Sequence, residues 1–376
     1  MNPRESAPGK ARYIMVGGFL GAGKTTAIAR MARHLTDRGN RVGLITNDQG
    51  SQLVDTTLLR AKGFPVEEIT GGCFCCRFDS LQAAAQNLTR ETRPDVFIAE
   101  PVGSCTDLIA TVAYPLRRIY GDRFSIAPLS VLIDPARAMR ILGLEKTGGS
   151  FSEKVVYVYR KQLEEADAVF INKSDILSDP HRLRLEAAVR ESFPKAEVFT
   201  GSARMGAGVE PWLEFLLTSE GRDSGSIDVD YDAYAEGEAL LGWLNGTVSL
   251  RASRPFDANQ ALVRLARLVR EDLARRGKEI AHLKLTLDEG GMLSVVSLVQ
   301  TDGDPDLRES LLDRVVGGKL IINLRAEADP ELLKVVVETA VGSLAGEGIG
   351  ATWEHVERFR PARPVPTYRF DRGSEE

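Results

Sequence analysis

A glycine-rich loop near the N-terminus constrains the fold of this chain more than any other feature. The loop is Gly18-Phe-Leu-Gly-Ala-Gly-Lys-Thr25, and it fits the pattern G-x-x-x-x-G-K-[ST]. An apolar run before it, Tyr13–Val16, predicts a β-strand, and a helical pattern follows from Lys24 to Thr36. A strand, a glycine-rich loop and a helix in this order are typical of α/β domains whose mostly parallel sheet is covered by helices.

The composition of the loop predicts a phosphate-binding site. Its glycines let backbone N–H groups converge on phosphate oxygens, and the helix N-terminus adds a partial positive charge. We expect Lys24 to reach the β- and γ-phosphates of a nucleotide and the Thr25 hydroxyl to ligate Mg²⁺. The residues expected at the phosphates are Gly18, Gly21, Ala22, Gly23, Lys24, Thr25 and Thr26. The alternative is a glycine-rich turn that has a lysine beside it by chance.

Further apolar runs, separated by helical patterns, extend the α/β pattern over residues 1–217. The runs lie at 42–46, 96–99, 129–133, 168–171 and 196–199, and helical patterns lie near 52–61 and 79–91. Runs this uniformly apolar are typical of strands that are buried on both faces of a parallel sheet. We therefore expect a P-loop nucleotide-binding domain in this part of the chain.

The pattern changes after residue 217. Residues 218–239 are rich in Ser, Gly and Asp and predict an acidic linker. Within 240–358, strands are expected near 243–251, 280–287, 292–300 and 318–325, and helices near 257–276 and 330–345. This order predicts a smaller α+β domain with antiparallel strands. Residues 359–376 are expected to form an extended tail.

A second motif, Asn172-Lys-Ser-Asp175, follows another apolar run. The Asp175 carboxylate suits the guanine edge because it accepts hydrogen bonds from two adjacent N–H groups. Adenine lacks this pair of donors and leaves the carboxylate unpaired, so we expect GTP to be preferred over ATP. The remaining contacts to the base are expected from Asn172, Lys173, Ser202 and Ala203. The alternative is that the four residues form a surface turn.

Two acidic residues lie at the ends of predicted strands, where α/β sheets place their ligands. We expect Glu100 to bind Mg²⁺, directly or through water, and Gly103 to contact the γ-phosphate through its N–H. Asp48 is expected to bind Mg²⁺ or to orient the attacking water. With Lys24 and Thr25 these acids form the expected catalytic set. The alternative role of either acid is to cap a helix N-terminus.

The most unusual feature is a thiol cluster in Gly71-Gly-Cys-Phe-Cys-Cys76, in which Cys73, Cys75 and Cys76 occupy three of four positions. In a straight strand Cys76 points away from the other two, so a shared metal ion requires a bend, which the glycines permit. Thiolates select Zn²⁺ or Cu(I) over Mg²⁺ or Ca²⁺. We hypothesise that Cys105, near Gly103, joins the cluster and makes metal coordination respond to GTP. The alternatives are small buried core residues or a redox role.

The overall composition argues against several classes of protein. The chain has 376 residues and a net charge of −5, whereas nucleic-acid-binding proteins normally carry a basic excess. No apolar run approaches the ~18 residues of a membrane span, and the first residues lack the apolar core of a signal peptide. We therefore expect a cytoplasmic protein with neither nucleic-acid nor membrane partners.

In this order, the motifs resemble those of the CobW-type metal-chaperone GTPases, relatives of the GTPases that help to insert nickel into urease and hydrogenase. The matching stretches are G-F-L-G-A-G-K-T-T, G-G-C-x-C-C, E-x-x-G and N-K-x-D, within residues ~12–216. The resemblance implies GTP hydrolysis with Mg²⁺ and a metal ion, Zn²⁺ or Co²⁺, held by Cys73, Cys75 and Cys76. It also implies delivery of that metal to a client metalloprotein or cobalamin-linked enzyme, and a GTP-dependent homodimer.

The chain departs from the family pattern at three places. Many members have a Glu immediately before the Asn that corresponds to Asn47, where it helps to bind metal, but this chain has Thr46. Asn47-Asp-Gln-Gly50 stands where N-E-F-G is common, and Pro101-Val102 replaces a more usual Cys/Ser-Thr/Ser pair. These differences make Cys105 the obvious substitute ligand. The histidine-rich segment of some members is absent, which argues against a metal-storage role.

Two other functions stay open from the residues alone. A P-loop kinase or ATPase that acts on a small molecule shares the phosphate site but needs neither Asp175 nor the thiols. A nucleotide-linked redox sensor uses the thiols as an oxidation switch instead of as metal ligands.

Overall fold

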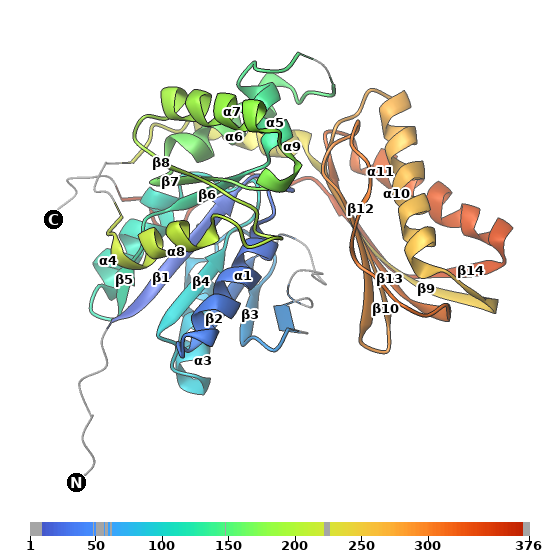
Figure 1. Ribbon diagram of the computed structural model, residues 1–376, viewed down its shortest axis with the longest axis horizontal. Coiled ribbons are helices and arrows are strands. Elements are labelled where there is room, and N and C mark those ends of the chain that lie inside the picture. Colours follow the sequence, from blue (N-terminus) through green and yellow to red (C-terminus); the bar gives the residue numbers. More distant parts are fainter. Residues whose placement is uncertain are drawn as a thin grey trace, which may run out of the picture.

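The computed structural model of this chain contains an eight-stranded and a six-stranded β-sheet (Figure 1). It describes residues 10–47, 49, 56, 59–60, 62–146, 148–221 and 226–370. The first sheet has the order β3-β2-β4-β1-β6-β7-β8, with β5 beside β1, and its pairs are parallel. Its strands are β1 Ala11–Gly18, β2 Val42–Asn47, β3 Val66–Ile69, β4 Val96–Glu100, β5 Phe124–Ile126, β6 Ser130–Ile133, β7 Ala168–Ile171 and β8 Glu197–Thr200. The α/β fold with a mostly parallel sheet is thereby confirmed.

Helices cover both faces of this sheet. They are α1 Lys24–Asp37, α3 Phe78–Glu91, α4 Tyr114–Tyr120, α5 Pro135–Ile141, α6 Glu153–Glu164, α7 Asp179–Ser192, α8 Val209–Thr218 and α9 Tyr231–Leu240. Met31 of α1 and Trp212 of α8 share one buried core, and Leu81 of α3 and Tyr159 of α6 share another. Two short turns also lie in this unit, a π-helical turn at Ile109–Ala113 and a 3-10 turn at Ser174–Ile176.

The second sheet is antiparallel and has the order β12-β11-β10-β13-β9-β14. Its strands are β9 Gly242–Phe256, β10 Ile280–Glu289, β11 Met292–Leu298, β12 Asp306–Glu309, β13 Val315–Ala326 and β14 Ile349–Phe359. Helices α10 Ala258–Arg275 and α11 Pro330–Gly342 cover its outer face, away from the first sheet (Figure 1). This smaller antiparallel α+β unit is also the one that the element order predicted.

Several strands have no counterpart in the sequence prediction. Strand β3 has two central glutamates, and edge strand β14 exposes most of its residues, so neither has a clear apolar alternation. The expected helical pattern at 52–61 lies largely outside the described residues. Within the described part of the chain, no helix combines the length and apolar character needed to cross a bilayer.

Part of the expected linker is a helix. Residues 231–240 form α9, whose N-terminus is capped by the Asp230 carboxylate, which accepts from the N–H groups of Asp232 and Ala233. Helix α9 packs against α6, and Gly237 lies so close to the Lys154 carbonyl that a Cβ would be 2.4 Å from it. Asp230 therefore caps a helix and Gly237 permits close packing, although a segment rich in Asp and Gly predicted an irregular linker.

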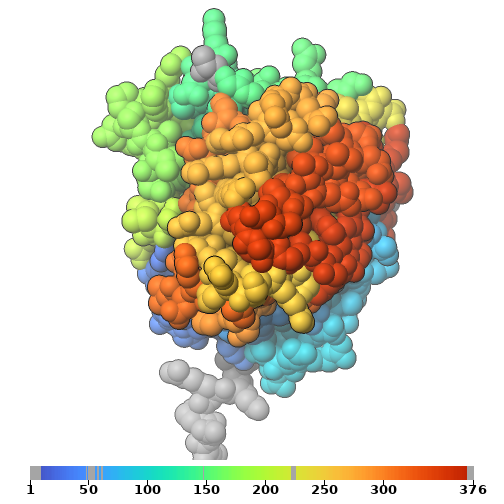
Figure 2. Space-filling view, turned by 90° about the vertical axis from the view of Figure 1, so that its right-hand side faces the viewer, coloured from blue at the N-terminus to red at the C-terminus, as the bar shows by residue number. Residues whose placement is uncertain are grey.

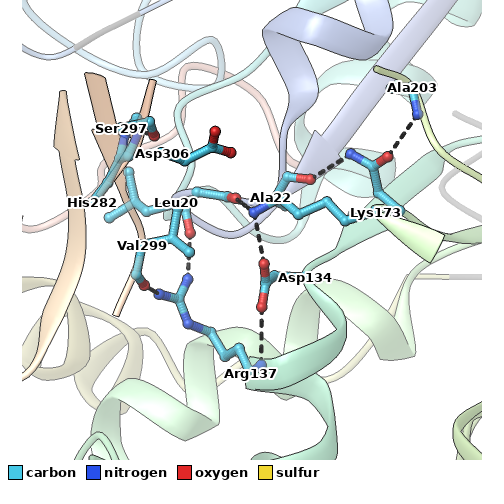
Figure 3. A network of polar contacts seen from close by, with 12 residues as sticks. Leu20, Ala22, Asp134, Arg137, Lys173, Ala203, His282, Ser297, Val299 and Asp306 are labelled. Carbon is cyan, nitrogen blue, oxygen red and sulfur yellow. Dashed lines mark hydrogen bonds and ion pairs between the residues drawn. The ribbon is translucent and has the colours of Figure 1, made fainter. Parts of the chain in front are cut away.

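A buried arginine joins the two parts of the chain (Figure 3). The Arg137 guanidinium donates to the carbonyls of Leu20 in the glycine-rich loop, Ala281 in β10 (3.0 Å) and Val299 after β11. Its guanidinium carbon also lies 5.2 Å from the ring centroids of Phe19 and Phe151. The second unit covers the centre of one face of the molecule (Figure 2). The glycine-rich loop lies against this unit, because a Cβ at Gly21 would be 2.7 Å from the Val299 side chain.

Candidate nucleotide and thiolate site

The glycine-rich loop has the geometry of a phosphate cradle. Lys24 begins α1, is buried, and donates from Nζ to the Gly18 carbonyl at 2.9 Å. Gly23 has φ of 92°, a left-handed conformation that favours glycine, and a Cβ there would be 2.5 Å from Asn172 Nδ2. The loop therefore closes tightly on itself and on the strand end beside it, which leaves its N–H groups at the N-terminus of α1.

Two of the three expected Mg²⁺ ligands, Thr25 and Glu100, lie together. Thr25 Oγ1 donates to Glu100 Oε1 at 3.2 Å, and Lys24 Nζ lies 3.9 Å from the same oxygen. Glu100 ends β4, which pairs with β1 before the loop. A hydroxyl and a carboxylate are hard oxygen ligands, the class that Mg²⁺ prefers. These side chains fit the ion that the sequence predicted, with Lys24 poised beside it.

The second predicted motif lies against the loop. Asn172 Nδ2 donates to the Ala22 carbonyl at 2.9 Å, and Asn172 Oδ1 accepts from the Ala203 N–H at 3.0 Å (Figure 3). Lys173, with φ of 57°, donates from Nζ to the Gly21 carbonyl at 2.9 Å and to Asp134 Oδ2 at 2.7 Å. The motif thus ties the phosphate loop to the Ser202–Ala203 loop, so the three predicted segments form one site.

Asp134 is a member of this site that sequence reasoning missed. Burial opposes its ionisation, but Lys173 and Arg137 outweigh burial and hold the pKa of Asp134 below its ordinary value. Its carboxylate also accepts from the Arg137 N–H at 3.0 Å and caps α5. The signal was an aspartate directly after a strand and before a proline, the usual arrangement at a helix start.

These segments line a cavity of about 670 Å³. From the first unit its wall includes Gly21, Gly23, Lys24, Thr25, Thr26, Glu100, Gly103, Asn172, Lys173, Asp175, Ser202 and Ala203. Asp175 is exposed at the rim, where its carboxylate is accessible to a base. Gly18 and Ala22 contribute through the carbonyls described above. Asp48, the other predicted acid, lies outside the described residues.

The second sheet forms the opposite wall of the cavity. Its polar face contributes Lys284, Asn323 and Arg325, and also His282, whose Nε2 lies 3.3 Å from Ser297 Oγ. Strand β12 reaches both sides of the opening through ion pairs. Glu309 lies 3.4 Å from Lys62, and Asp306 lies 3.3 Å from Arg204. Element order alone gave no indication that the α+β unit takes part in the nucleotide site.

The thiols lie on a tight turn beside this cavity. Cys73 O accepts from the N–H groups of Cys76 (3.1 Å) and Arg77 (2.9 Å), and Gly72 before it has φ of 153°. The sulfur of Cys73 lies 2.8 Å from that of Cys75 and 3.2 Å from that of Cys76. All three sulfurs lie within 4.8 Å of one another, and no other group of three or more His, Cys, Asp or Glu in the described chain does so. The bend that the glycines were expected to permit is present.

Hydrogen bonding concentrates negative charge on one sulfur. Hydrogen bonding with the thiols of Cys105, Cys75 and Cys76 holds the pKa of Cys73 well below its ordinary value. Hydrogen bonding with Cys73, together with burial, raises the pKa of Cys75 and Cys105 well above the ordinary value of a thiol. The same two causes raise the pKa of Cys76 to about 11. Zinc bound at about 2.3 Å to three thiolates requires sulfurs that are about 3.8 Å apart. The sulfurs of Cys75 and Cys76 therefore need to move away from that of Cys73 by about an ångström or less to admit the ion.

Cys105 contacts the cluster without belonging to the group of three. Its thiol helps to lower the pKa of Cys73, whereas its sulfur is not within 4.8 Å of all the others. Gln162 of α6 donates to the carbonyls of Gly103 (3.0 Å) and Cys105 (2.8 Å), and Ser104 donates to Glu238 of α9. The Gly103–Cys105 segment, which lines the cavity at Gly103, is therefore held by α6 and α9.

Buried carboxyl groups support the same segment. Glu165 accepts from the Thr106 hydroxyl and from the Ile109 N–H, both at 3.2 Å, and burial raises its pKa to about 8. Burial also raises the pKa of Glu238 to about 8. Both groups are therefore largely protonated at neutral pH and add little charge next to the thiols.

A second connection runs through Asn47 at the end of β2. Its Nδ2 donates to Gly72 O at 2.7 Å and to Ile69 O at 3.0 Å, and the residue also lines the cavity. Gly72 immediately precedes Cys73. The nucleotide cavity and the thiol turn thus share two segments, one through Asn47 and one through Gly103 to Cys105.

Comparison with known families matches residues 12–200 to "CobW/HypB/UreG, nucleotide-binding domain". The match covers half of the chain and contains the phosphate loop, the thiol turn and the Asn172 motif. This chain belongs to the CobW/HypB/UreG family. The resemblance drawn from the motifs is thereby confirmed.

Two curated relatives within the CobW/HypB/UreG match are described as zinc chaperones. The zinc chaperone YeiR of Escherichia coli (strain K12) is 30% identical over 167 residues, which is 44% of this chain and 47% of that protein. The zinc chaperone CobW of Sinorhizobium sp is 28% identical over 198 residues, 47% of this chain and 54% of that protein. The chain therefore spans about half the length of the curated relatives it matches.

Two solved structures also show similarity to this chain. HypB from Helicobacter pylori in complex with nickel has a TM-score of 0.40 and 21% identity, covering 56% of this chain and 86% of that one. Zn(II)-bound YjiA GTPase from E. coli has a TM-score of 0.37 and 13% identity, covering 88% and 99%.

The Asp175 carboxylate predicts a measurable base preference. Replacing Asp175 with Ala removes the acceptor for the guanine N–H groups, so GTP affinity should fall by about 10- to 100-fold while ATP affinity stays the same. Nucleotide titration calorimetry measures both values. Asp179→Ala, an exposed aspartate four residues on, is the matched control and should change neither. Unchanged GTP affinity in Asp175→Ala would contradict the assignment.

The thiol geometry predicts unequal roles for two cysteines. Cys73→Ser removes the sulfur that all the other thiols contact, so zinc affinity should fall by at least about 100-fold in a chelator competition. Cys105→Ser weakens a hydrogen bond to that sulfur and should cost about tenfold. A loss in Cys105→Ser as large as that in Cys73→Ser would make Cys105 a ligand. If Cys73→Ser bound zinc as tightly as the wild-type protein does, the assignment of a metal site to this cluster would be wrong.

Proposed function

We propose that this chain is a GTP-hydrolysing metallochaperone, in which nucleotide state controls a thiolate metal site. The observation that carries the proposal is the pair of segments shared by the nucleotide cavity and the thiol turn, at Asn47 and at Gly103–Cys105. Membership of the family and two relatives described as zinc chaperones support it.

The nucleotide is GTP with Mg²⁺, held by the residues that the sequence assigned. Lys24 exchanges the Gly18 carbonyl for the β- and γ-phosphates, and Thr25 and Glu100 hold Mg²⁺. When bound, this ion neutralises charge on the phosphates. The loop N–H groups and Lys24 stabilise charge on the transferring phosphoryl group, and Asp175 selects guanine. Turnover is slow, because the described residues offer no obvious base for the attacking water.

The cargo is zinc or cobalt, bound by Cys73, Cys75 and Cys76. Three buried thiolates suit a borderline metal, and a three-ligand set leaves a position through which the ion passes to another protein. The recipient is a client metalloprotein or a cobalamin-linked enzyme. A GTP-dependent homodimer and a cytoplasmic location belong to the same proposal.

Coupling follows from how the shared segments are held. A γ-phosphate that accepts a hydrogen bond from the Gly103 N–H shifts the Gly103–Cys105 segment. The Cys105 thiol in this segment stabilises negative charge on Cys73, so the shift changes the metal site. Movement of Asn47 changes the backbone at Gly72 directly. A coupling free energy of about 1–3 kcal/mol is sufficient to load and release an ion, and corresponds to an affinity change of about 5- to 150-fold.

Anaerobic zinc titration of the full chain tests the proposal. Zinc affinity should differ at least about fivefold between protein with Mg²⁺ and GDP and protein with Mg²⁺ and a non-hydrolysable GTP analogue. Lys24→Ala, which weakens phosphate binding, is the control and should show a single zinc affinity under both conditions. Equal affinities in the wild-type protein would contradict the chaperone function and leave a nucleotide hydrolase.

A further inference from the structure

The C-terminal segment lies directly over the thiol turn. After β14 the chain leaves the second unit, and its last described residues lie on the first unit (Figure 1). The Thr367 N–H donates to Cys75 O at 2.8 Å, and the Thr367 hydroxyl to Cys76 O at 3.4 Å. The Val365 N–H donates to Cys76 Sγ at 3.3 Å. Backbone of the tail therefore touches one of the expected metal ligands at its sulfur.

Side chains at the end of the segment anchor it on the first unit. Tyr368 meets Phe78 edge to face, with ring centroids 5.3 Å apart. Arg369 Nε lies 2.8 Å from the buried Asp107 carboxylate, and the Phe370 N–H donates to Ala110 O at 3.0 Å. Asp107 and Ala110 follow Cys105 in the segment that lines the cavity at Gly103, so the strap is anchored on that same segment.

The start of the segment is anchored as well. Arg360 lies 3.1 Å from Asp329, and Arg363 pairs with Asp232 of α9. Pro361, Pro364 and Pro366 restrict the backbone between the anchors to extended conformations, which lowers the entropy lost on holding it in place. Residues 361–370, hereafter the strap, are thus fixed at both ends and stiff between them.

The strap covers the accessible side of the cluster. Cys73 and Cys75 are 5% and 1% exposed, whereas Cys76 is only half-buried. An ion that enters or leaves therefore passes Cys76, the thiol that the strap contacts. An N–H group directed at a thiolate also stabilises its charge and fixes its orientation, as outer-shell partners of metal ligands do.

We propose that the strap is a working part of the metal site: the Val365 N–H positions Cys76 as a ligand, and the anchored segment slows the passage of the ion. The inference rests on the proposed function for the identity of the cargo. Release of the strap opens the site for transfer, and its contact with Asp107 and Ala110 gives the nucleotide-linked segment a means to control that release.

A pair of substitutions at one position tests the ligand-positioning role. Val365→Pro removes the N–H donor, and the position precedes Pro366, so it already favours the extended backbone that proline adopts. Val365→Ala retains the donor, and the valine side chain is 70% exposed, so little packing is lost. The zinc dissociation constant should rise about tenfold in Val365→Pro and change less than about twofold in Val365→Ala. Equal values in the two variants would overturn this role.

Untying the end of the strap tests its control of access. The double variant Tyr368→Ala/Arg369→Ala removes two anchors, so zinc release to a chelator should accelerate at least about tenfold. Alkylation of Cys76 in the metal-free protein should accelerate as well. Arg358→Ala on β14 loses an exposed ion pair with Glu331 of α11; it is the control and should leave both rates unchanged. Unchanged rates in the double variant would overturn the strap as a barrier.

The two readouts separate this inference from the proposed function. Alkylation of Cys76 in metal-free protein depends on the strap alone, and faster alkylation in the double variant supports it whether or not zinc is the cargo. If the wild-type chain takes up no metal and alkylation still responds, the proposed function fails and the strap remains as a cover. If zinc binds tightly and neither rate responds, the strap fails and the chaperone remains.

Discussion

Two hydrogen bonds from one amide side chain hold the nucleotide cavity and the thiol turn together. Asn47 stands at the carboxyl end of β2 and donates to Ile69 O and Gly72 O, one residue before Cys73. The parallel sheet makes this possible, because the carboxyl ends of β1, β2 and β4 meet at one edge. The phosphate loop, Glu100 and the glycines before the thiols are placed side by side by that edge.

The second unit contributes more than a covering. Arg137 satisfies three carbonyls from three segments at once, and a buried guanidinium left without one of them would be costly. The P-loop is therefore positioned by the α+β sheet as well as by its own strand and helix. The strap then returns from that sheet to the thiols, so the second unit contacts both halves of the site.

Short sequence motifs predicted those parts of the site whose residues lie close together in the chain. The phosphate loop, the Asn172 motif and the thiol turn each depend on residue types at fixed spacing, and the structure brings them to one edge of the sheet. Asn47, Asp134, Arg137 and the strap were not assigned a role, because their partners lie far away in the sequence and only the fold brings them together. Helix α9 was missed because its capping and packing residues, Asp230 and Gly237, are also those of a loop.

The central claim is that Asn47 connects the nucleotide cavity to the thiol turn and does not itself bind the metal ion. The decisive measurement is zinc affinity in the GDP form and in the GTP-analogue form for Asn47→Ala, with Thr46→Val on the same strand as control. The account predicts that each ligand still binds to Asn47→Ala while the ratio of the two zinc affinities falls toward one, and that Thr46→Val keeps the wild-type ratio. A wild-type ratio in Asn47→Ala would contradict it.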